Sequence, residues 1–395
     1  MTAAERAPAP HAGLRVLDLS RILAGPWIAQ TLADLGADVI KVESPAGDDT
    51  RGWGPPWVEE PGGGRTAAYF HACNRGKRSV VADLDDAEDL ALVRALAAEA
   101  DVLVENFRVG GLARFGLDWE TLSAANPRLV YCSVTGFGQD GPYAHRAGYD
   151  FMIQGMAGIM SLTGSPDGEP QKIGVAFADL FTALYGVVGI QAALARRERT
   201  GRGERVDVAL FDSMAGVLAN QAMNFLATGV APTRMGNAHP NIAPYQTFET
   251  ADGHLIVAVG NDAQFARLCT ALGVESLARD ARFLTNADRV ANREAMTAAL
   301  GERIRERRRD ELLAALEAAV VPAGPINTVA DVFADPQFVH RGMRIEAEGV
   351  PGVRTPVVLD GAAPVSERRS PRLGEHTEEV RRELAGRAQP RPVKP

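Results

Sequence analysis

Short runs rich in apolar residues alternate with amphipathic stretches through the first 200 residues of the chain. Four of these runs end at Gly, Pro or charged residues and predict buried strands: 14–20, 37–43, 100–107 and 128–134. Between them, residues 25–36 and 85–100 have the apolar spacing of helices, and acidic residues begin the second. This rhythm predicts an α/β fold with a largely parallel sheet and helices on both faces.

The pattern changes near residue 225. A Pro- and Asn-rich stretch at 237–248 precedes a predicted strand at 253–260, and helical spacing continues to about residue 320. Residues 321–328 are rich in Pro and Gly and predict a linker. We therefore predict a large α/β domain over 1–215, a smaller α+β domain over 225–330, and a linker and C-terminal segment over 331–395.

Length and charge narrow the classes of function. A chain of 395 residues suggests two domains, and a net charge of −8 argues against a nucleic-acid or anionic-membrane partner. Cys73, Cys132 and Cys269 are widely spaced, and no histidine motif typical of metal sites is present, so we predict no metal site. The same cysteine usage predicts a reducing, cytoplasmic location.

One apolar stretch, 175–195, contains a single carboxylate, Asp179. A buried charge is costly, so such a group pairs, caps a helix or serves chemistry. On spacing alone, Asp179 as the N-cap of a helix over 180–199 is the favoured interpretation. The apolar run at 183–195 is interrupted by Gln191 and is shorter than a bilayer requires, so we predict no membrane span.

Two further motifs have ordinary interpretations beside functional ones. Residues 136–141 fit GxGxxG, but Pro142 follows in place of the helix that a dinucleotide site requires, which disfavours a nicotinamide-dependent oxidoreductase. Basic residues cluster at 74–79 and 106–116. Each cluster is either a solvated face or a phosphate site, and spacing leaves both open.

Seven segments in their order along the chain resemble the family III CoA-transferases. They are ILAGPWIAQTLADLGADVIKVE, NRGKRSV, VENFRVG, GFGQDGPYAHRAGYD, VAFADL, RRERTGRGERVDVAL and LGEHTEEV. The resemblance covers nearly the whole chain and is closest to the succinyl-CoA:hydroxymethylglutarate branch. It implies a Rossmann-like large domain that the C-terminal segment completes. It also implies a small domain inserted between these two parts, and an interlocked homodimer.

The resemblance also implies chemistry for Asp179. This residue stands where the family has its nucleophilic aspartate, which forms an acyl anhydride and then an aspartyl-CoA thioester. Acyl-CoA thioesters and small carboxylic acids would be the substrates, with no permanently bound cofactor. Branch likeness favours dicarboxylic acids, with succinyl-CoA as donor.

Site residues carry over position by position from the same resemblance. Eleven are implied to bind CoA: Leu23, Ala24, Arg75, Lys77, Ala82, Leu84, Asn106, Phe107, Arg114, Tyr149 and Asp150. Four in the second domain are predicted to bind the acceptor acid: Arg234, Asn237, His239 and Gln246.

Departures from the family pattern qualify the substrate. Leu23 replaces the glutamine of formyl-CoA transferases, which disfavours an oxalate or formyl substrate, and the glycine loop of those enzymes is absent. Ser44 and Asp85 replace basic residues that bind CoA phosphates in some members. The residues that could compensate are Arg51, Arg108 and Arg114.

Three alternatives remain beside the transferase. A 2-methylacyl-CoA racemase or epimerase of the same fold needs an imidazole base, and that position falls on Tyr149. A nicotinamide oxidoreductase lacks the helix after Gly141. A non-catalytic acyl-CoA-binding protein would not need Asp179.

Overall fold

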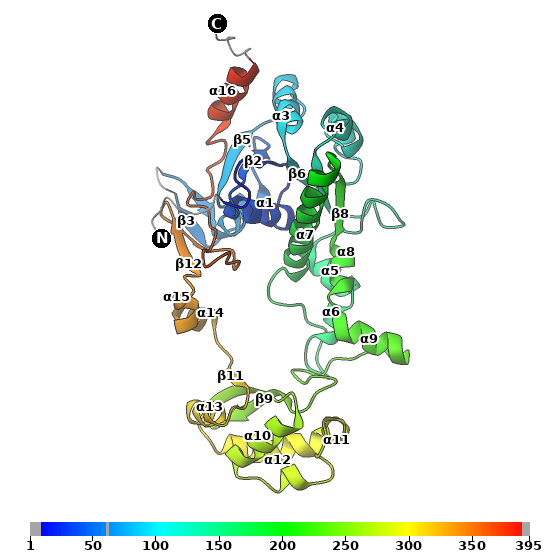
Figure 1. The fold of residues 1–395 in the computed structure, drawn as a ribbon, viewed down its shortest axis with the longest axis vertical. Coiled ribbons are helices and arrows are strands. Elements are labelled where there is room, and N and C mark those ends of the chain that lie inside the picture. The colour runs from blue at the N-terminus through cyan, green and yellow to red at the C-terminus, as the bar shows by residue number, and fades with distance from the viewer. Residues whose placement is uncertain (1–8, 61–62, 389–395) are drawn as a thin grey trace. The chain divides into compact units, whose positions relative to one another are not determined.

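The computed structural model describes residues 9–60 and 63–388 and divides into two compact units (Figure 1). The first unit consists of the chain up to 159, 173–219 and the chain from 336 onward. The second unit consists of 160–172 and 220–335. It therefore includes a short segment, 160–172, that lies outside the predicted small domain.

A six-stranded parallel sheet organises the first unit. Its strands are β1 (Arg15–Asp18), β2 (Asp38–Glu43), β5 (Lys77–Val81), β6 (Val102–Glu105), β7 (Val130–Thr135) and β8 (Arg205–Ala209). They are ordered β5-β2-β1-β6-β7-β8, and all neighbouring strands are parallel. In chain order this is 3-2-1-4-5-6, the Rossmann order, which confirms the predicted fold class. The direction of winding changes between β1 and β6.

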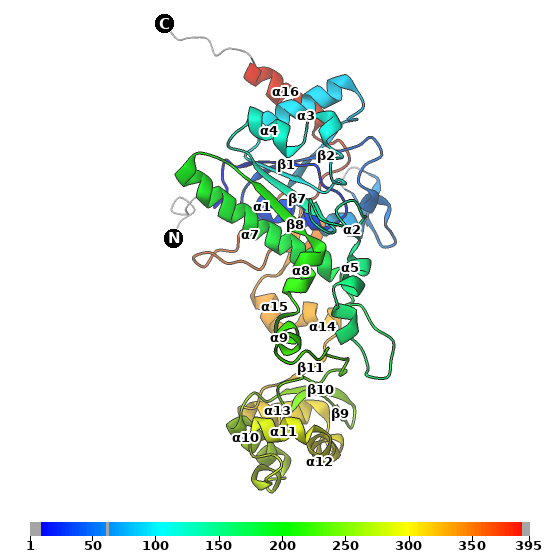
Figure 2. The same cartoon turned by 90° about the vertical axis from the view of Figure 1, so that its right-hand side faces the viewer.

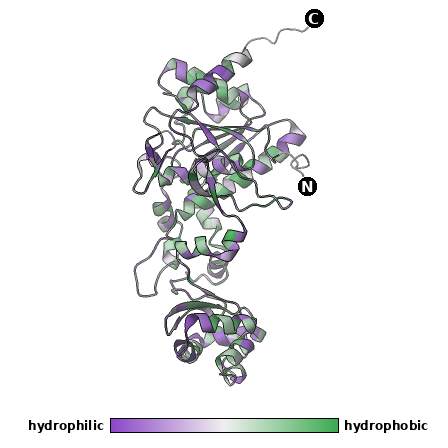
Figure 3. Ribbon diagram, turned by 90° about the vertical axis from the view of Figure 1, so that its left-hand side faces the viewer, coloured by the Kyte–Doolittle hydropathy of each residue, from purple (hydrophilic) through white to green (hydrophobic). Residues whose placement is uncertain are grey.

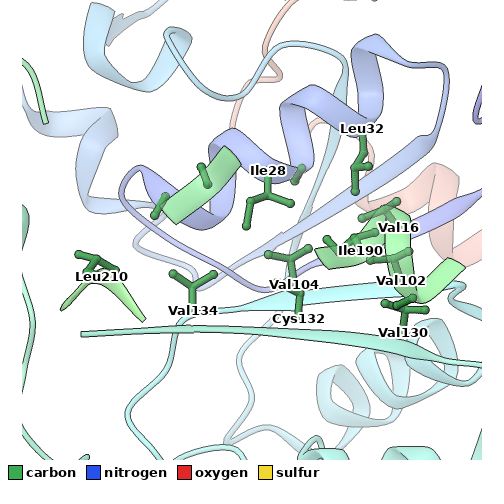
Figure 4. Packing of buried hydrophobic residues seen from close by; sticks show 14 of the residues in the cluster. Val16, Ile28, Leu32, Val102, Val104, Val130, Cys132, Val134, Ile190 and Leu210 are labelled. Carbon is green, nitrogen blue, oxygen red and sulfur yellow. The ribbon is translucent and has the colours of Figure 1, made fainter. Parts of the chain in front are cut away.

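Helices cover both faces of this sheet (Figure 2). One face carries α1 (Ala24–Asp34) and α7 (Phe177–Thr200), and the other carries α3 (Ala87–Glu99), α4 (Trp119–Ala125) and α16 (Thr377–Ala388). Side chains alternate between the faces, as strand geometry requires. Val102 and Val104 pack toward Ile28 of α1 (Figure 4), whereas Leu103 packs in the cluster on the other side.

The C-terminal segment returns to the first unit, as the resemblance implies. The backbone N–H of Val81 in β5 donates to the Thr377 hydroxyl of α16 at 3.0 Å. Arg78 of the same strand pairs with Glu379 and Glu383 at 3.1 and 2.9 Å.

Helix α7 begins at Phe177, three residues before the predicted start. Its N-cap position is Ala176, so Asp179 lies in the first turn, and the prediction of Asp179 as the cap is wrong. With 24 residues, α7 is long and apolar enough to cross a membrane by length and composition alone. Its position is that of a helix covering a sheet, because it packs on α1, β7 and β8.

Shorter elements complete the first unit. They are β3 (Trp57–Glu59), β4 (Arg65–Ala67), α2 (Ala68–His71), α5 (Asp150–Met156), α8 (Leu210–Gly216), α15 (Pro336–His340), β12 (Arg344–Ala347) and β13 (Val350–Val353). At the boundaries of the two units lie α6 (Ile159–Leu162) and α9 (Ala219–Thr228).

The second unit has its own antiparallel sheet, in which β10 (Gly253–Ala258) lies between β11 (Ala323–Pro325) and β9 (Tyr245–Thr250). Its helices are α10 (Asp262–Leu272), α11 (Asn286–Ala291), α12 (Arg293–Arg305), α13 (Arg309–Ala318) and α14 (Val329–Ala334). The predicted linker at 321–328 is therefore wrong in part, because β11 pairs with β10 within it. Pro325 is compatible with this because β11 is an edge strand.

Helices in both units carry apolar and polar stretches side by side (Figure 3). In the second unit, the apolar side chains of α10 and α12 form a core with β9 and β10, including Phe248, Leu255, Phe265 and Leu300. Each unit therefore has a hydrophobic core of its own.

Candidate active site

Two loops meet where the winding of the parallel sheet reverses. One follows β1 and contains Arg21, and the other follows β6 and begins at Asn106. The Asn106 side chain joins them: its Oδ1 accepts from the Arg21 N–H at 2.9 Å, and its Nδ2 donates to the Arg21 carbonyl at 2.7 Å. Crevices at such reversals, beyond the carboxyl ends of the strands, are the usual ligand sites of open α/β sheets.

A cavity of about 530 Å³ opens at this point, and all of its lining residues belong to the first unit. Eight of them are residues predicted from the sequence: Leu23, Ala24, Asn106, Phe107, Arg114, Tyr149, Asp150 and Asp179. They come from four stretches separated along the chain, so the fold converges them on one place. A cavity of this size is in the range of small-molecule and cofactor sites.

Asp179 is placed by a contact from a distant part of the sequence. Asp150, at the start of α5, accepts a hydrogen bond at 2.7 Å from the N–H of Ala178 in the first turn of α7. Its second oxygen accepts from the side-chain amide of Gln154, which is fully buried, at 2.8 Å. Asp150 therefore anchors the helical turn from which Asp179 projects.

The Asp179 carboxylate is a perturbed acid. Burial raises its pKa to about 7, and the negative charge of Asp150 adds to the rise. Within residues 9–60 and 63–388, no hydrogen bond or ion pair holds this carboxylate. Near neutral pH it is partly ionised and weakly stabilised, which is the condition of a carboxylate nucleophile.

Basic side chains also line the cavity. Arg114 stacks on the Phe115 ring at 4.2 Å and lies 3.4 Å from Asp85, and both charged groups are largely exposed. Arg108 lines the same cavity. This arrangement favours the phosphate-binding interpretation of the 106–116 cluster, because guanidinium groups bind phosphate oxygens well.

Four polar lining residues were absent from the sequence prediction: Arg21, Thr135, His145 and Arg146. The last two lie inside the quoted motif GFGQDGPYAHRAGYD, so the motif was found without its individual roles. Arg146 stacks over Tyr143 at 4.5 Å.

Tyr69 was also missed. Burial and the negative charges of Asp179 and other acids raise its pKa to about 12, which places it in the same electrostatic surroundings.

The structure does not bring two predicted CoA-binding residues to this cavity. Arg75 is buried and contacts both carboxylate oxygens of Asp34, at 3.1 and 2.6 Å. Lys77 is fully buried, and its ammonium donates to Asp18, to the Pro26 carbonyl and to Asn74 at 2.8 to 2.9 Å. Both side chains therefore serve the interior of the domain.

Three other predicted positions also lie away from the cavity lining. Ala82 is buried, and Leu84 packs partly against the same hydrophobic cluster. Arg51, considered as a substitute phosphate ligand, makes a two-point contact with Glu43 at 2.8 and 2.7 Å. That leaves Arg108 and Arg114 as the compensating candidates at the cavity.

The four predicted acceptor-binding residues all belong to the second unit and have partners there. Arg234 donates to the carbonyls of Ser165 and Gly168 at 3.1 and 2.9 Å. Asn237 donates to Thr247, His239 accepts from the Asn241 N–H, and Gln246 accepts from Thr297. Their role in binding an acid stays a prediction.

The described part of the chain holds no group of three His, Cys, Asp or Glu side chains suited to a metal ion. A glycine loop at the cavity packs closely, backbone against backbone. A Cβ on Gly136 would lie 2.6 Å from the Cα of Gly148, so the two loop backbones touch beside the cavity.

The sequence matches the model of CoA-transferase family III over residues 12–377. The chain belongs to this family. This confirms the predicted enzyme class, and CoA thioesters are the substrates that the class uses. The Rossmann order of a family III CoA-transferase thus serves CoA chemistry, and the nicotinamide alternative loses its basis.

Two relatives and one solved structure support the assignment of this family III CoA-transferase. A succinate–glutarate CoA-transferase of Agrobacterium fabrum is 54% identical over 95% of this chain and 96% of that protein. An acetyl-CoA:oxalate CoA-transferase of Acetobacter aceti is 42% identical over 95% and 96%. The crystal structure of a CAIB/BAIF family protein from Brucella suis has a TM-score of 0.87 and 64% identity, over 96% of this chain and 100% of that one.

Proposed function

We propose that this enzyme moves CoA from succinyl-CoA to a second dicarboxylic acid, with glutarate as the preferred acceptor, through covalent intermediates on Asp179. The observation that carries the proposal is the Asp179 carboxylate, which lines the cavity without a hydrogen-bond partner among the described residues and with a pKa of about 7. The substrate class is supported by the Agrobacterium and Acetobacter relatives, whose names contain dicarboxylic acids.

The reaction consists of four substitutions at carbonyl carbon. The Asp179 carboxylate attacks the thioester carbonyl, and the C–S bond breaks. CoA thiolate is released, and a mixed anhydride of Asp179 and succinate remains. The thiolate attacks the aspartyl carbonyl of that anhydride, so succinate leaves and an aspartyl-CoA thioester remains.

The second half runs the same steps in reverse with a new acid. The acceptor carboxylate attacks the aspartyl thioester and expels CoA thiolate, which gives an anhydride of Asp179 and the acceptor. The thiolate then attacks the acceptor carbonyl, and the C–O bond to Asp179 breaks to regenerate its carboxylate. One thioester replaces another, so the overall reaction needs no added source of free energy.

The protein's own contribution is placement and weak solvation of the nucleophile. Asp150 fixes the turn that carries Asp179 through the N–H of Ala178, and burial keeps the Asp179 carboxylate poorly solvated. A carboxylate held next to a thioester in this state reacts much faster than one in water.

We also infer a homodimer as part of the proposal. Leu184, Tyr185 and Val188 of α7 are 50%, 46% and 63% exposed, which leaves an apolar surface on a helix that packs against the sheet by its other side. Such a surface is typical of a covered interface. The resemblance to family III enzymes, which pair with a second copy, makes that copy the expected occupant.

Two expectations about surroundings belong to the same proposal. The three cysteines are free and buried, which supports a reducing compartment and hence the cytoplasm. The reaction above uses side chains and CoA alone, so we expect the purified enzyme to work without an added cofactor.

A screen of donors against acceptors tests the proposed function. Purified enzyme is incubated with succinyl-CoA or acetyl-CoA and with glutarate, oxalate, malate, butyrate or cinnamate, and the CoA products are identified by mass spectrometry. We expect succinyl-CoA with glutarate to give the highest kcat/KM. A preference for butyrate or cinnamate would contradict the dicarboxylate assignment and leave only the family activity.

Racemisation is the second candidate, because an imidazole, that of His145, lines the cavity with Asp179. A 2-methylacyl-CoA incubated in deuterated water reports it directly. We expect no wash-in of deuterium at the α-carbon on the time scale of transfer, because Tyr149 stands where the racemase relatives have their base. Rapid wash-in that His145→Ala abolishes would establish racemase activity instead.

A further inference from the structure

The loop between β1 and α1 is held by side chains at every backbone polar group of residues 20–22. The Ser20 N–H donates to Asp18, and the Ser20 carbonyl accepts from Lys41. The backbone N–H and the carbonyl of Arg21 both bond to the Asn106 side chain. The Ile22 N–H donates to Asp48, and the Ile22 carbonyl accepts from the Cys73 thiol. Neighbouring backbone usually satisfies most such groups. This turn therefore has its shape imposed from outside.

Ile22 shows why external restraint is needed. Its φ is +72°, in the left-handed region that a β-branched residue rarely adopts. Strained backbone of this kind persists where the surroundings over-determine it, and it gathers at functional sites. Ile22 lines the cavity, as do Leu23 and Asp179.

An ion pair with no exposed side-chain surface lies beneath this turn. The Lys41 ammonium is 3.0 Å from the Asp48 carboxylate and 2.7 Å from the Ser20 carbonyl. Asp48 receives the Ile22 N–H at 3.3 Å and the Thr50 N–H at 3.0 Å. Buried ion pairs are weak contributors to stability, and their best-attested use is to specify one conformation.

We propose that Asp48, held by Lys41, is a positioning residue for the transfer reaction, because it locks Ile22 in its left-handed conformation and so fixes the cavity wall that the turn forms. The proposal rests on the proposed function. Asp48 is absent from the residues that line the cavity, so it acts through Ile22 and touches no substrate.

A double-mutant cycle tests the role of Asp48. Glycine adopts a positive φ without steric cost, so Ile22→Gly makes the restraint unnecessary. We expect Asp48→Asn to lower kcat about tenfold in the chain with Ile22, and less than about threefold in the chain with Ile22→Gly. We expect the dissociation constant for CoA to change less than kcat in either background, because Arg108 and Arg114, the candidates for phosphate binding, lie outside the turn that Asp48 holds.

The outcomes separate a positioning role from a merely structural one. Equal losses of kcat in the two backgrounds would overturn the proposal. If Asp48→Asn does not fold, the double variant Lys41→Met/Asp48→Asn, which removes both charges, takes its place in the cycle and is judged by the same ratio.

Asp34→Asn serves as the matched control. Asp34 is also a buried carboxylate paired with a buried cation, Arg75, but it makes no contact with residues 20–22. We expect it to lower the melting temperature and leave kcat unchanged, and a tenfold loss of kcat would overturn the specific role of Asp48. All kcat ratios are measured with the donor and acceptor that the wild-type enzyme turns over best. A wrong substrate assignment would therefore be seen in the wild-type substrate preference and would not affect the test of Asp48.

Discussion

Two carboxylates, Asp150 and Asp179, line one cavity and have opposite surroundings. Asp150 accepts hydrogen bonds from the Ala178 N–H and from the Gln154 amide. Asp179 has no partner among the described residues, and burial followed by the charge of Asp150 raises its pKa to about 7. The first residue is thus equipped to hold structure and the second to react, which is how one fold gives two acids different tasks.

Replacing Asp179 by Asn should abolish transfer and stabilise the fold in the same protein. The unfolded carboxyl has its ordinary pKa of 3.8 and the folded one about 7, so the unfolded state ionises first and wild-type stability falls between pH 4 and 7. Asn removes that loss. We expect the melting temperature of Asp179→Asn to exceed that of wild type by a few degrees at pH 8, and to equal it near pH 4.

Calorimetry across that pH range and trapping with hydroxylamine check the two halves of this prediction. Wild type incubated with acyl-CoA should form a hydroxamate at Asp179, which peptide mass spectrometry locates. Substantial turnover by the Asn variant would rule out Asp179 as the nucleophile. A melting temperature of Asp179→Asn that falls below that of wild type at pH 8 but not at pH 4 would mean that the ionised carboxylate stabilises the fold.

Affinity for CoA should depend on Arg114 and be limited by Asp85. The two side chains lie 3.4 Å apart and are both largely exposed, so their mutual attraction is small and screened by salt. Arg114→Ala should weaken CoA binding about tenfold at low salt, because a charge-assisted contact to phosphate is lost.

The neighbouring acid supplies the matched variant. Asp85→Asn frees the guanidinium of Arg114 and should tighten CoA binding by up to about fivefold at low salt, an effect that 0.5 M salt largely removes. Titration calorimetry measures both variants. Unaltered affinity in both would return the 106–116 cluster to an ordinary solvated face.

At the scale of elements, the local sequence pattern predicts the strands and the interiors of the helices. It does not predict where helix α7, which carries Asp179, begins. The apolar runs at 14–20 and 128–134 predict β1 and β7 because these strands are buried on both faces. The start of α7 escapes prediction because its first-turn N–H is satisfied by Asp150, 28 residues earlier in the chain. A cap supplied from that distance leaves no signal at residues 175–179.

Strand β11 gives the same lesson in the second unit. Three residues with Gly and Pro read as a linker, and only the pairing of Ala323 with Val257 and of Gly324 with Ile256 makes them a strand. Pairing between segments so far apart is a tertiary effect that outweighs local propensity.

Neutralising Asp150 should shift the pH dependence of the reaction. Its charge helps to raise the pKa of Asp179, so Asp150→Asn should lower that pKa and move the acid limb of kcat/KM from near pH 7 to lower pH. The Asn oxygen can still accept the Ala178 N–H, and although the Asn amide nitrogen cannot accept from Gln154, the Gln154 amide keeps the Val175 carbonyl as an acceptor, so the fold should be kept. A pH profile identical to wild type would show that Asp150 does not act on Asp179 electrostatically.

Asp150→Ala separates charge from anchoring. It removes the acceptor of the buried Ala178 N–H and one of the two acceptors of the Gln154 amide, which should cost about 1–3 kcal/mol of stability. We expect kcat to fall further than in Asp150→Asn, since the turn carrying Asp179 loosens. Denaturant unfolding and steady-state kinetics give both values.

For the whole molecule, the sequence pattern and the family resemblance predict the Rossmann-like domain. The strand order, which the sequence does not show, locates the expected ligand site. The loops after β1 and β6 flank the reversal of winding, and Asn106 ties them together. Neither this contact nor the burial of Arg75 and Lys77 is visible in the sequence, because a basic motif looks the same whether it meets a ligand or an internal carboxylate. Three-dimensional neighbours decide between the two.

Assembly is the property of the whole molecule that α7 predicts. Leu184 and Val188 are one helical turn apart and exposed, so they form one apolar stripe. In a dimer with twofold symmetry a stripe of this kind meets its own copy or a neighbouring face, and each substitution acts twice. We therefore expect Leu184→Lys/Val188→Glu to raise the dimer dissociation constant by about 100-fold or more.

Sedimentation velocity over a range of protein concentrations measures that change, and the chain offers a matched control. Leu284, in the second unit, is 50% exposed, as is Leu184, so Leu284→Lys places a charge on a comparable apolar side chain that is not part of the stripe and should leave the dimer intact. Equal dissociation by both variants would mean a non-specific loss of solubility or fold. Since α7 is also long and apolar enough to cross a bilayer, flotation with liposomes is the remaining discriminator. If the wild type floats and the stripe variant does not, the stripe binds lipid. If the wild type stays at the bottom of the gradient as a dimer, and the dimer dissociates only when the stripe is charged, the stripe binds a second copy of the chain.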